Sequence, residues 1–455
     1  MKKFKQALVC GLGGSGSAAV SLLRAEGCAV TAIDRADTPD LRRQSDELRQ
    51  QGATVLLGAV AVPESPFDIC VVSPGVPDSS PWIVSMRSRG RGVPVMSELE
   101  LGWSRRGRSR VVAITGSNGK STAVKWFAES LQAAGLKALP CGNYGPAISK
   151  VVMESPGADW LVVEASTFQM ETIIGFRPDV GILLNIFPNH LDRHATLKRY
   201  TELKARLFSN TLEDDTCVVL EPLLAEIRAL SGGRGRWISF GSSVTSEYRY
   251  EAGHVLHDHR MVADLAGTRF ANEVLGLAGA AVVAGIEACG VAADCAVRSA
   301  RAFIPLPHRM ELIREIGSVK YVNDSKATNL TAMAAALRMT PGKTRLIAGG
   351  LVKEKDFNFM KELLAQRVLG VYLIGKATEE MALAWSDVVS CFPCGDLETA
   401  VRKAGHDARA GETVLLSPAC ASFDQYRNFE ERGQHFVRVV QNLAEEASQW
   451  KRKTI

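Results

Sequence analysis

The sequence lacks a long apolar run. Its first residues, Met-Lys-Lys-Phe-Lys, lead into an apolar stretch of only a few residues that ends at Gly11. A signal peptide needs a longer apolar region, and a membrane-spanning helix needs about 20 apolar residues. We therefore expect a cytoplasmic protein without a membrane partner.

The sequence also lacks a cysteine framework. Its ten cysteines are scattered without the spacing of a disulfide scaffold or a zinc module. Cys391 and Cys394 form a C-x-x-C pair, but no second pair accompanies them, so a zinc or redox role is disfavoured. Unpaired cysteines in a chain of this size suit a reducing compartment such as the cytosol.

A strong charge of one sign is missing too. The formal net charge is +5 over 455 residues, which does not indicate a nucleic-acid partner and suits anionic substrates. The densest basic segment, Arg105–Arg110, is expected to be a solvated linker. Hydrophobic residues make up 46% of the chain and charged residues 23%, which are the proportions of a globular enzyme.

Short apolar runs of β type alternate with helical stretches along most of the chain. This order predicts an α/β fold built on parallel, doubly wound sheets. A basic, loop-like stretch near residue 97 and a break marked by Pro305 and Pro307 divide the chain into three expected domains, residues 1–96, 97–306 and 307–455. The expected strands are Ala7–Cys10, Ala29–Ile33, Thr54–Leu57, Asp68–Ser73, Val111–Ile114, Trp160–Glu164, Val180–Asn185, Glu311–Ile316, Val319–Asn323, Thr344–Ala348, Val371–Ile374 and Thr413–Leu416. The main expected helices are Ser17–Glu26, Ala123–Ala134, Leu197–Phe208, Val274–Ala288, Ala292–Ala302 and, near the end, Asn428–Trp450.

A phosphate-binding loop follows the strand expected over Val111–Ile114. Its glycines allow a tight turn, and Lys120 adds a positive charge at the start of a helix. The pattern G-x-x-G-K-S is shorter than the usual G-x-x-x-x-G-K-[ST], because Ile114 occupies the first glycine position. The residues expected to hold a nucleotide phosphate and its Mg²⁺ are Gly116, Ser117, Asn118, Gly119, Lys120, Ser121 and Thr122.

Polar residues follow several other expected strands. Glu164 ends a buried strand at the sheet edge where α/β proteins bind ligands, so it is a candidate Mg²⁺ ligand, and His190 lies beyond a neighbouring strand. Lys204 falls on a helix and by itself would be a surface charge. The segments Tyr321–Asn329 and Ser417–Gln425 also follow strands; they could bind a small charged molecule or form turns with local hydrogen bonds.

A second glycine-rich turn lies near the N-terminus. Gly11, Gly13 and Gly16 come between a strand and a helix, and Asp34 ends the next strand. This order matches the dinucleotide fingerprint G-x-G-x-x-G. Taken alone, it would support a nicotinamide or flavin enzyme.

Together these segments resemble the Mur ligase family over nearly the whole chain, and most closely its D-glutamate-adding members. The matching motifs are Thr115–Thr122, Gly142–Gly145, Glu164, Asn185–Arg193, Pro307–Glu311, Asn323–Asn329, Gly349–Phe357, Leu416–Gln425 and Asn428–Gly433. The resemblance implies a Rossmann-like UDP-binding domain, a central P-loop ATPase-like domain with a parallel sheet, and a Rossmann-like C-terminal domain. The first glycine-rich turn would then bind a UDP-linked substrate, and no redox cofactor is implied.

The resemblance also implies roles for individual residues. UDP contacts would come from Gly14, Ser15, Ser73, Gly75, Asn143 and Ser166. ATP would bind to the phosphate loop, Asn272, Arg309 and Asp324, and D-glutamate to Thr328, Lys353, Ser422, Phe423 and Phe429. One Mg²⁺ would be held by Ser121 and Glu164 and a second by His190 and a carbamylated Lys204, while Lys326 would steady the phosphoryl group. Asn189, Ala271 and Leu275 depart from the family pattern near the metal and the adenine, whereas the functional lysines and Glu164 match it, so an active enzyme is expected.

The implied activity is the ATP-dependent addition of D-glutamate to UDP-N-acetylmuramoyl-L-alanine through an acyl phosphate, in peptidoglycan precursor synthesis. The expected form is a monomer that acts on small molecules. Three alternatives stay open: a related acid–amino-acid ligase such as a folylpolyglutamate synthase, a nicotinamide-dependent dehydrogenase favoured only by Gly11–Asp34, and a non-catalytic nucleotide sensor.

Overall fold

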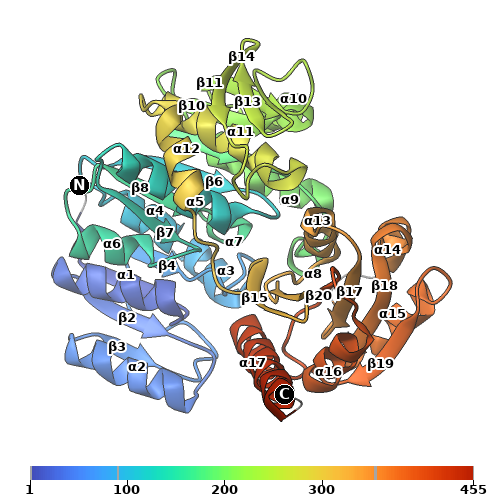
Figure 1. The fold of residues 1–455 in the computed structure, drawn as a ribbon. Helices are drawn as coiled ribbons and strands as arrows, with labels where there is room; N and C mark the ends of the chain where they lie inside the picture. Colours follow the sequence, from blue (N-terminus) through green and yellow to red (C-terminus); the bar gives the residue numbers. More distant parts are fainter. Residues whose placement is uncertain (1–2, 90–91, 353–355, 454–455) are drawn as a thin grey trace. The chain divides into compact units, whose positions relative to one another are not determined.

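The computed structural model describes residues 3–89, 92–352 and 356–453, and it divides into two compact units, Met1–Ala302 and Phe303–Ile455. Both units are α/β, as predicted (Figure 1). The described strands form sheets of five and nine strands in the first unit and of six strands in the second. The predicted boundary after residue 306 lies four residues beyond the end of the first unit, and the boundary after residue 96 stays a prediction.

The N-terminal sheet is wholly parallel, with the strand order β3-β2-β1-β4-β5. Alternate residues of β1 face opposite sides, so Ala7 and Val9 enter one core and Leu8 and Cys10 another. Helices α1 and α2 cover the first side, and α3 covers the second. The strands are β1 (Gln6–Cys10), β2 (Ala29–Ile33), β3 (Thr54–Leu56), β4 (Ile69–Val72) and β5 (Val95–Ser97), and the helices are α1 (Gly14–Ala25), α2 (Pro39–Gln50) and α3 (Pro81–Ser88).

Helix α4 (Glu98–Trp103) joins the first two sheets. It places Leu101 in the core of the N-terminal sheet and Leu99 in the core of the central sheet. The basic segment Arg105–Arg110 was predicted to be a solvated linker, which is correct for the exposed Gly107 and Arg108 but not for its two ends. Arg105 is almost buried and forms an ion pair with Glu26, and Arg110 begins β6 and stacks on Trp160.

The central sheet has the order β14-β13-β12-β11-β10-β9-β6-β8-β7. Its strands from β12 to β7 run parallel, while β12, β13 and β14 form antiparallel pairs at one edge. The strands are β6 (Arg110–Thr115), β7 (Ala138–Gly142), β8 (Trp160–Glu164), β9 (Val180–Leu183), β10 (Thr216–Leu220), β11 (Arg236–Gly241), β12 (Tyr248–Glu251), β13 (His254–His257) and β14 (Arg260–Asp264).

Helices cover both faces of the central sheet. On one face, α11 approaches so closely that a side chain at Gly285 would collide with Phe127 of α5 and Ile182 of β9. On the other face, α6, α7 and α10 pack with α4 on a core that includes Val111 and Ala113. The helices are α5 (Lys120–Ala133), α6 (Ile148–Glu154), α7 (Thr167–Met170), α8 (Leu191–His194), α9 (Leu197–Ala205), η1 (Arg206–Phe208), η2 (Glu221–Leu223), α10 (Leu224–Ser231), α11 (Glu273–Ala288) and α12 (Ala293–Ala302).

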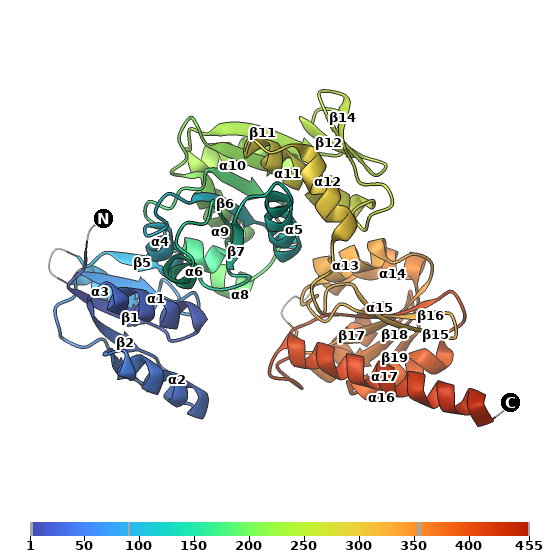
Figure 2. The ribbon, with the colours of Figure 1, turned by 60° about the vertical axis from the view of Figure 1, so that its left-hand side comes forward.

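The second unit contains a six-stranded sheet with the order β15-β16-β20-β17-β18-β19. Among the described strands of this sheet, only β15 and β16 pair antiparallel. Figure 2 shows α13 and α14 on one face of this sheet and α16 and α17 on the other, in agreement with the two cores. The elements are β15 (Glu311–Ile316), β16 (Val319–Asn323), α13 (Leu330–Met339), β17 (Thr344–Gly349), η3 (Phe357–Met360), α14 (Lys361–Arg367), β18 (Val368–Ile374), η4 (Gly375–Ala377), α15 (Thr378–Trp385), β19 (Cys391–Gly395), α16 (Leu397–Asp407), β20 (Thr413–Ala419) and α17 (Phe429–Lys453).

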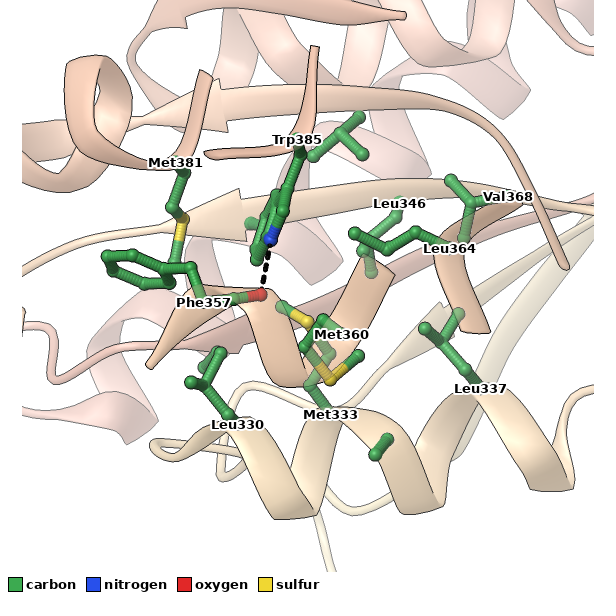
Figure 3. Close-up of a cluster of buried hydrophobic side chains, with 14 of the residues drawn as sticks. Leu330, Met333, Leu337, Leu346, Phe357, Met360, Leu364, Val368, Met381 and Trp385 are labelled. Carbon is green, nitrogen blue, oxygen red and sulfur yellow. Dashed lines mark hydrogen bonds between the residues drawn. The ribbon is translucent and has the colours of Figure 1, made fainter. Parts of the chain in front are cut away.

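A buried tryptophan anchors one core of the second unit (Figure 3). Trp385 is fully covered, and its indole N–H donates to the carbonyl oxygen of Phe357 at 2.9 Å. Met333, Met360 and Met381 fill the space around these rings. Because a buried indole N–H needs a partner, this bond fixes η3 against α15.

The two cysteines of the C-x-x-C pair lie in β19, at the edge of the sheet. Cys391 packs against the core beneath α13–α15, and Cys394 packs against the core beneath α16 and α17. Two residues three positions apart in a strand face opposite sides, so the pair cannot bind one metal ion or close a disulfide. A zinc site or disulfide shared by these two thiols is therefore excluded.

Most predicted strands are present within a residue or two, and Ala29–Ile33, Trp160–Glu164, Glu311–Ile316 and Val319–Asn323 have the predicted ends. The first helix differs, because it begins at Gly14 rather than Ser17. Gly14 and Gly16 therefore belong to the helix, and Gly13 is its N-cap. No helix in the described part of the chain has both the length and the hydrophobicity needed to span a bilayer.

Candidate active site

The phosphate loop connects β6 to α5. Gly119 is the N-cap of α5 and has a φ of 82°, in the left-handed region that glycine tolerates best. Lys120 folds back over the loop, and its Nζ donates to the carbonyl oxygens of Gly116 and Ser117 at 2.8 and 3.0 Å. The loop therefore places a cation beside the N-terminus of a 14-residue helix, the arrangement that suits a phosphate.

Asn185 supports this loop from the end of β9. Its Oδ1 accepts from the backbone N–H groups of Ser117 and Asn118 at 3.0 Å each, and its Nδ2 donates to the carbonyl of Asn118 at 3.1 Å. The Ser117 hydroxyl accepts from the Phe187 N–H at 2.8 Å and lies 3.2 Å from the hydroxyl of buried Tyr200. Ser117 and Asn118, which were predicted to contact phosphate, thus also form hydrogen bonds within the protein.

Glu164 ends β8 and is almost fully buried. Its Oε2 accepts from the Ser121 hydroxyl at 2.6 Å, and its Oε1 accepts from the Asn143 side chain at 2.6 Å. Carboxylate and hydroxyl oxygens are ligands that Mg²⁺ prefers, and two oxygens this close can occupy adjacent positions of an octahedron. The predicted pair Ser121 and Glu164 therefore fits a Mg²⁺ ion.

Lys204 is buried beneath the phosphate loop, with 1% of its surface exposed. Its Nζ donates to the carbonyl of Gly116 at 2.8 Å and lies 4.5 Å from the centre of the Tyr200 ring. Burial, helped by the nearby charge of Lys120, lowers the pKa of Lys204 well below its ordinary value, although Glu164 acts in the opposite direction. The interpretation of Lys204 as a surface charge is therefore wrong.

His190 is the N-cap of α8 and has a left-handed backbone with a φ of 55°. Its ring meets the edge of Phe168 with 4.8 Å between the ring centres. The described residues contain no group of three or more His, Cys, Asp or Glu placed to hold a metal ion. A second metal site on His190 would accordingly need the modified Lys204, and that assignment stays a prediction.

Arg193 and His194 were not predicted as site residues. Arg193 forms an ion pair with Glu171 and also donates to the carbonyl oxygens of Pro74 and Val76 at 2.8 and 3.2 Å. His194 is buried, with its Nε2 3.0 Å from the Thr167 hydroxyl, and burial lowers its pKa. Arg193 thus ties the segment that carries His190 to the loop after β4.

A pocket of ≈ 490 Å³ lies beside the start of α1. It is lined by Gly14, Ser15, Ala18, Pro74, Gly142, Asn143, Gly145, Pro146, Ala147, Lys150 and Gln169. This pocket therefore brings together three of the predicted UDP contacts, Gly14, Ser15 and Asn143. The close packing beside it also explains Gly16, where a side chain would overlap the carbonyl oxygen of Gly11.

The other predicted UDP residues do not line this pocket. Ser73 is buried, and its Cβ would lie 2.9 Å from a side chain added at Gly11. Gly75 lies in the loop after β4. Ser166 caps α7 through reciprocal hydrogen bonds with Gln169. Asp34, the acid of the apparent dinucleotide fingerprint, accepts from the N–H of Leu12 at 2.7 Å and thus stabilises the glycine-rich turn itself.

Asp324 is a buried acid of the second unit. Its Oδ1 accepts from the Met310 N–H at 3.2 Å, and its Oδ2 accepts from the Ser417 hydroxyl at 3.0 Å. Burial raises its pKa to about 7, although these two donors and Arg309 act in the opposite direction. This carboxyl links the segment after β16 with the end of β20.

Arg432 is a structural residue of the same site to which the sequence assigned no role. It is 1% exposed, and its guanidinium donates to the Ser325 hydroxyl at 3.0 Å, to the Ser325 carbonyl at 2.8 Å and to the Cys420 carbonyl at 3.1 Å. Burial lowers its pKa to about 10. Arg432 therefore holds the two predicted D-glutamate loops together, while the Lys326 ammonium lies 3.8 Å from the centre of the Phe429 ring.

The remaining predicted residues are less closely gathered. Ser422 is buried, Thr328 is partly buried, and Phe423 exposes 64% of its surface. Asn272 caps α11, where its Oδ1 accepts from the N–H groups of Val274 and Leu275, so its contact with ATP stays a prediction. Lys353 lies outside the described residues.

Asn185 could have been found with the signal that identified Glu164, because it is also the first polar residue after an apolar strand. Tyr200 carries no such signal. It lies in a polar helix, and its contact with Ser117 spans 83 positions of the sequence.

Comparisons with known proteins agree with this arrangement. The chain matches the Mur ligase middle domain over residues 114–283 and the Mur ligase glutamate ligase domain over residues 308–420. A protein from Acidobacterium capsulatum named UDP-N-acetylmuramoylalanine--D-glutamate ligase is 36% identical, with 96% of each chain covered. A protein of the same name from Koribacter versatilis is 37% identical, with 97% of this chain and 98% of the relative covered. The crystal structure of MurF ligase from Thermotoga maritima in complex with ADP has a TM-score of 0.60 at 18% identity, covering 92% of this chain and 95% of that chain, which shows a shared fold.

Proposed function

The chain belongs to the Mur ligase family, and we propose that it uses ATP to join D-glutamate to UDP-N-acetylmuramoyl-L-alanine in peptidoglycan precursor synthesis. The observation that carries this proposal is the 36–37% identity, over almost the full length, to curated relatives named for that reaction. The phosphate loop supports it, because Lys120 folds back over the loop and the Ser121 hydroxyl lies 2.6 Å from Glu164.

The proposed reaction has two steps. An oxygen of the L-alanine carboxylate attacks the γ-phosphorus of ATP, and the bond to ADP breaks to give an acyl phosphate. The neutral amine of D-glutamate then attacks the acyl carbon and loses one proton, and phosphate leaves from the tetrahedral intermediate with the electron pair of the broken C–O bond. Phosphoryl transfer depends on positioning and charge neutralisation, which Lys120 and Lys326 would supply as cations.

ATP is proposed to bind at the phosphate loop, Arg309 and Asp324, with Mg²⁺ held by Ser121 and Glu164. When bound, the metal would neutralise charge on the transferred phosphoryl group. The Ser121–Glu164 pair presents two oxygens 2.6 Å apart, which supports this assignment. Contacts of D-glutamate with Thr328, Ser422, Phe423, Phe429 and Lys353 remain part of the proposal, although Lys353 lies outside the described residues.

Lys204 is proposed to carry a carbamate. Burial lowers the pKa of Lys204, which favours the neutral amine, and a neutral amine can attack CO₂ to form a C–N bond with release of one proton. The resulting anion would suit a second Mg²⁺ shared with His190, whereas a bare ammonium would repel it. A protein equilibrated with ¹³C-bicarbonate should show a carbamate carbon resonance that is absent from Lys204→Ala.

The assay for the whole proposal is ADP release from ATP with UDP-N-acetylmuramoyl-L-alanine and a panel of amino acids. We expect release that depends on both the nucleotide substrate and D-glutamate, with the amide product detected by mass spectrometry. Use of L-glutamate in place of D-glutamate, or a requirement for a folate substrate, would assign a different ligase. ATP binding without turnover would indicate a sensor, and substrate-dependent reduction of a nicotinamide cofactor would indicate a dehydrogenase.

We further propose a cytoplasmic monomer that acts on small molecules and has no nucleic-acid or membrane partner. The small net charge of +5 supports the absence of a nucleic-acid role. Light scattering at the concentrations of the activity assay tests the monomer, because a dimer would double the measured mass.

A further inference from the structure

Lys150 is the one charged residue among the described residues that line the pocket beside α1, and no carboxylate is among them. It lies in the first turn of α6, and the neighbouring wall is the loop from Gly142 to Ala147. A pocket with one cation and no anion in its lining has an electrostatic preference for a negatively charged ligand.

The ammonium of Lys150 is only weakly engaged in the structure. It forms an ion pair with Glu154 at 3.8 Å, and the two side chains expose 54% and 57% of their surfaces. An exposed pair of this kind contributes little, and the order Lys before Glu on a helix is the less favourable one. The long, flexible side chain can therefore turn to a ligand in the pocket at little cost.

The other polar side chains of the pocket provide neutral hydrogen bonds only. Ser15 and Gln169 have no charge, and the Asn143 amide already donates to Glu164 at 2.6 Å. Helix α1 adds the partial positive charge of its N-terminus, because Gly13 provides no side-chain cap and the first turn contains no acidic residue. Lys150 is thus the single full positive charge available to a ligand among these residues.

We propose that Lys150 binds the diphosphate of the nucleotide substrate and so selects a diphosphate-linked sugar nucleotide. This inference rests on the proposed function, because it takes this pocket as the site of the UDP-linked substrate. A diphosphate diester carries two negative charges near neutral pH, and hydrogen bonds between charged partners are about twice as strong as neutral ones. Lys150 binds substrate and takes no part in the bond-making steps.

The experiment compares the binding of UDP and of uridine to the full chain by calorimetry. We expect Lys150→Gln to raise the Kd for UDP about tenfold, because one charge-assisted hydrogen bond is lost. The Kd for uridine should stay within about twofold of the wild-type value. Lys150→Arg should retain UDP binding, because it keeps the charge. In turnover, Lys150→Gln should raise KM for the nucleotide substrate by the same factor and leave kcat and KM for ATP unchanged.

Lys137→Gln is the matched control. Lys137 is exposed and stands before β7, whereas the pocket begins at Gly142 at the other end of this five-residue strand, roughly 17 Å away. The two variants change the net charge equally. Both side chains are exposed, so equal melting temperatures should show that both variants fold.

Two outcomes separate this inference from the proposed function. If the wild-type protein binds UDP and Lys150→Gln binds it equally well, or if Lys137→Gln loses as much affinity, the role of Lys150 is overturned while the proposed function stands. If the wild-type protein binds neither UDP nor its sugar conjugates, the proposed function fails, and the assignment of Lys150 fails with it.

Discussion

Asn185 offers a direct test of how the phosphate loop is supported. Replacing it with Asp retains an oxygen that accepts from the N–H groups of Ser117 and Asn118, but removes the donation to the Asn118 carbonyl. The substitution also places a negative charge beside the loop that is proposed to hold the ATP phosphates. Its main effect should therefore fall on ATP binding rather than on folding.

The size of the effect follows from the geometry. The Asn185 oxygen lies 3.0 Å from the loop nitrogens, and a phosphate oxygen hydrogen-bonded to that loop would be about 6 Å from it. At an effective dielectric constant of about 20, one unit of like charge at that distance costs about 2 to 3 kcal/mol. We therefore expect a roughly 30- to 150-fold increase in Kd for ATP.

The assay is calorimetric titration with ATP, and Asn185→Ala is the companion variant. Asn185→Ala removes the hydrogen bonds without adding charge and should weaken ATP by less, about tenfold, through a looser loop. Raising the salt concentration should reduce the loss in Asn185→Asp more than the loss in Asn185→Ala. Equal ATP affinity in wild-type protein and Asn185→Asp would refute the placement of the phosphates at this loop.

Three further predictions concern single residues. Lys204→Ala should abolish ADP release, and added bicarbonate should not restore it, because the amine that would carry the carbamate is gone; full activity of this variant would contradict the carbamate. Burial raises the pKa of Asp324 from 3.8 to about 7, so the folded state binds this proton more tightly than the unfolded state, and stability should fall as pH rises from about 4 to 7. Asp324→Asn should flatten the dependence of the melting temperature on pH over this range. An unchanged slope would contradict the assigned pKa. Trp385→Ala should lower the free energy of unfolding of the second unit by about 3 to 5 kcal/mol in denaturant titration. Leu383→Ala is the control, because Leu383 lies on the same helix and is 86% exposed, and it should change this free energy by less than about 0.5 kcal/mol. Similar values for the two variants would contradict the anchoring role of Trp385.

The sequence predicted the strands well, because each is a short apolar run that ends in glycine, proline or a polar residue. Glu164 and Asp324 were found for the same reason, since each is a polar residue directly after such a run. The start of α1 was missed because Gly14 and Gly16 have low helix propensity, and the helix accepts them where the chain packs closely against Gly11.

The burial of Lys204 could not be predicted from its own helix. α9 also contains Lys198, Arg199 and Glu202, so its local pattern does not distinguish the one lysine that lies beneath the phosphate loop. The contacts of Lys204 with Gly116 and of Arg432 with Ser325 span 88 and 107 positions. Such contacts depend on which strands become neighbours, which is decided by the whole sheet.

The most direct test of the proposed chemistry follows the oxygen atoms. UDP-N-acetylmuramoyl-L-alanine labelled with ¹⁸O in its L-alanine carboxylate is incubated with ATP and D-glutamate, and the released phosphate is examined by mass spectrometry. If the carboxylate is phosphorylated to an acyl phosphate, each phosphate carries one ¹⁸O atom. Unlabelled phosphate accompanying amide formation would show that the carboxylate never receives the phosphoryl group, and would contradict the proposed function.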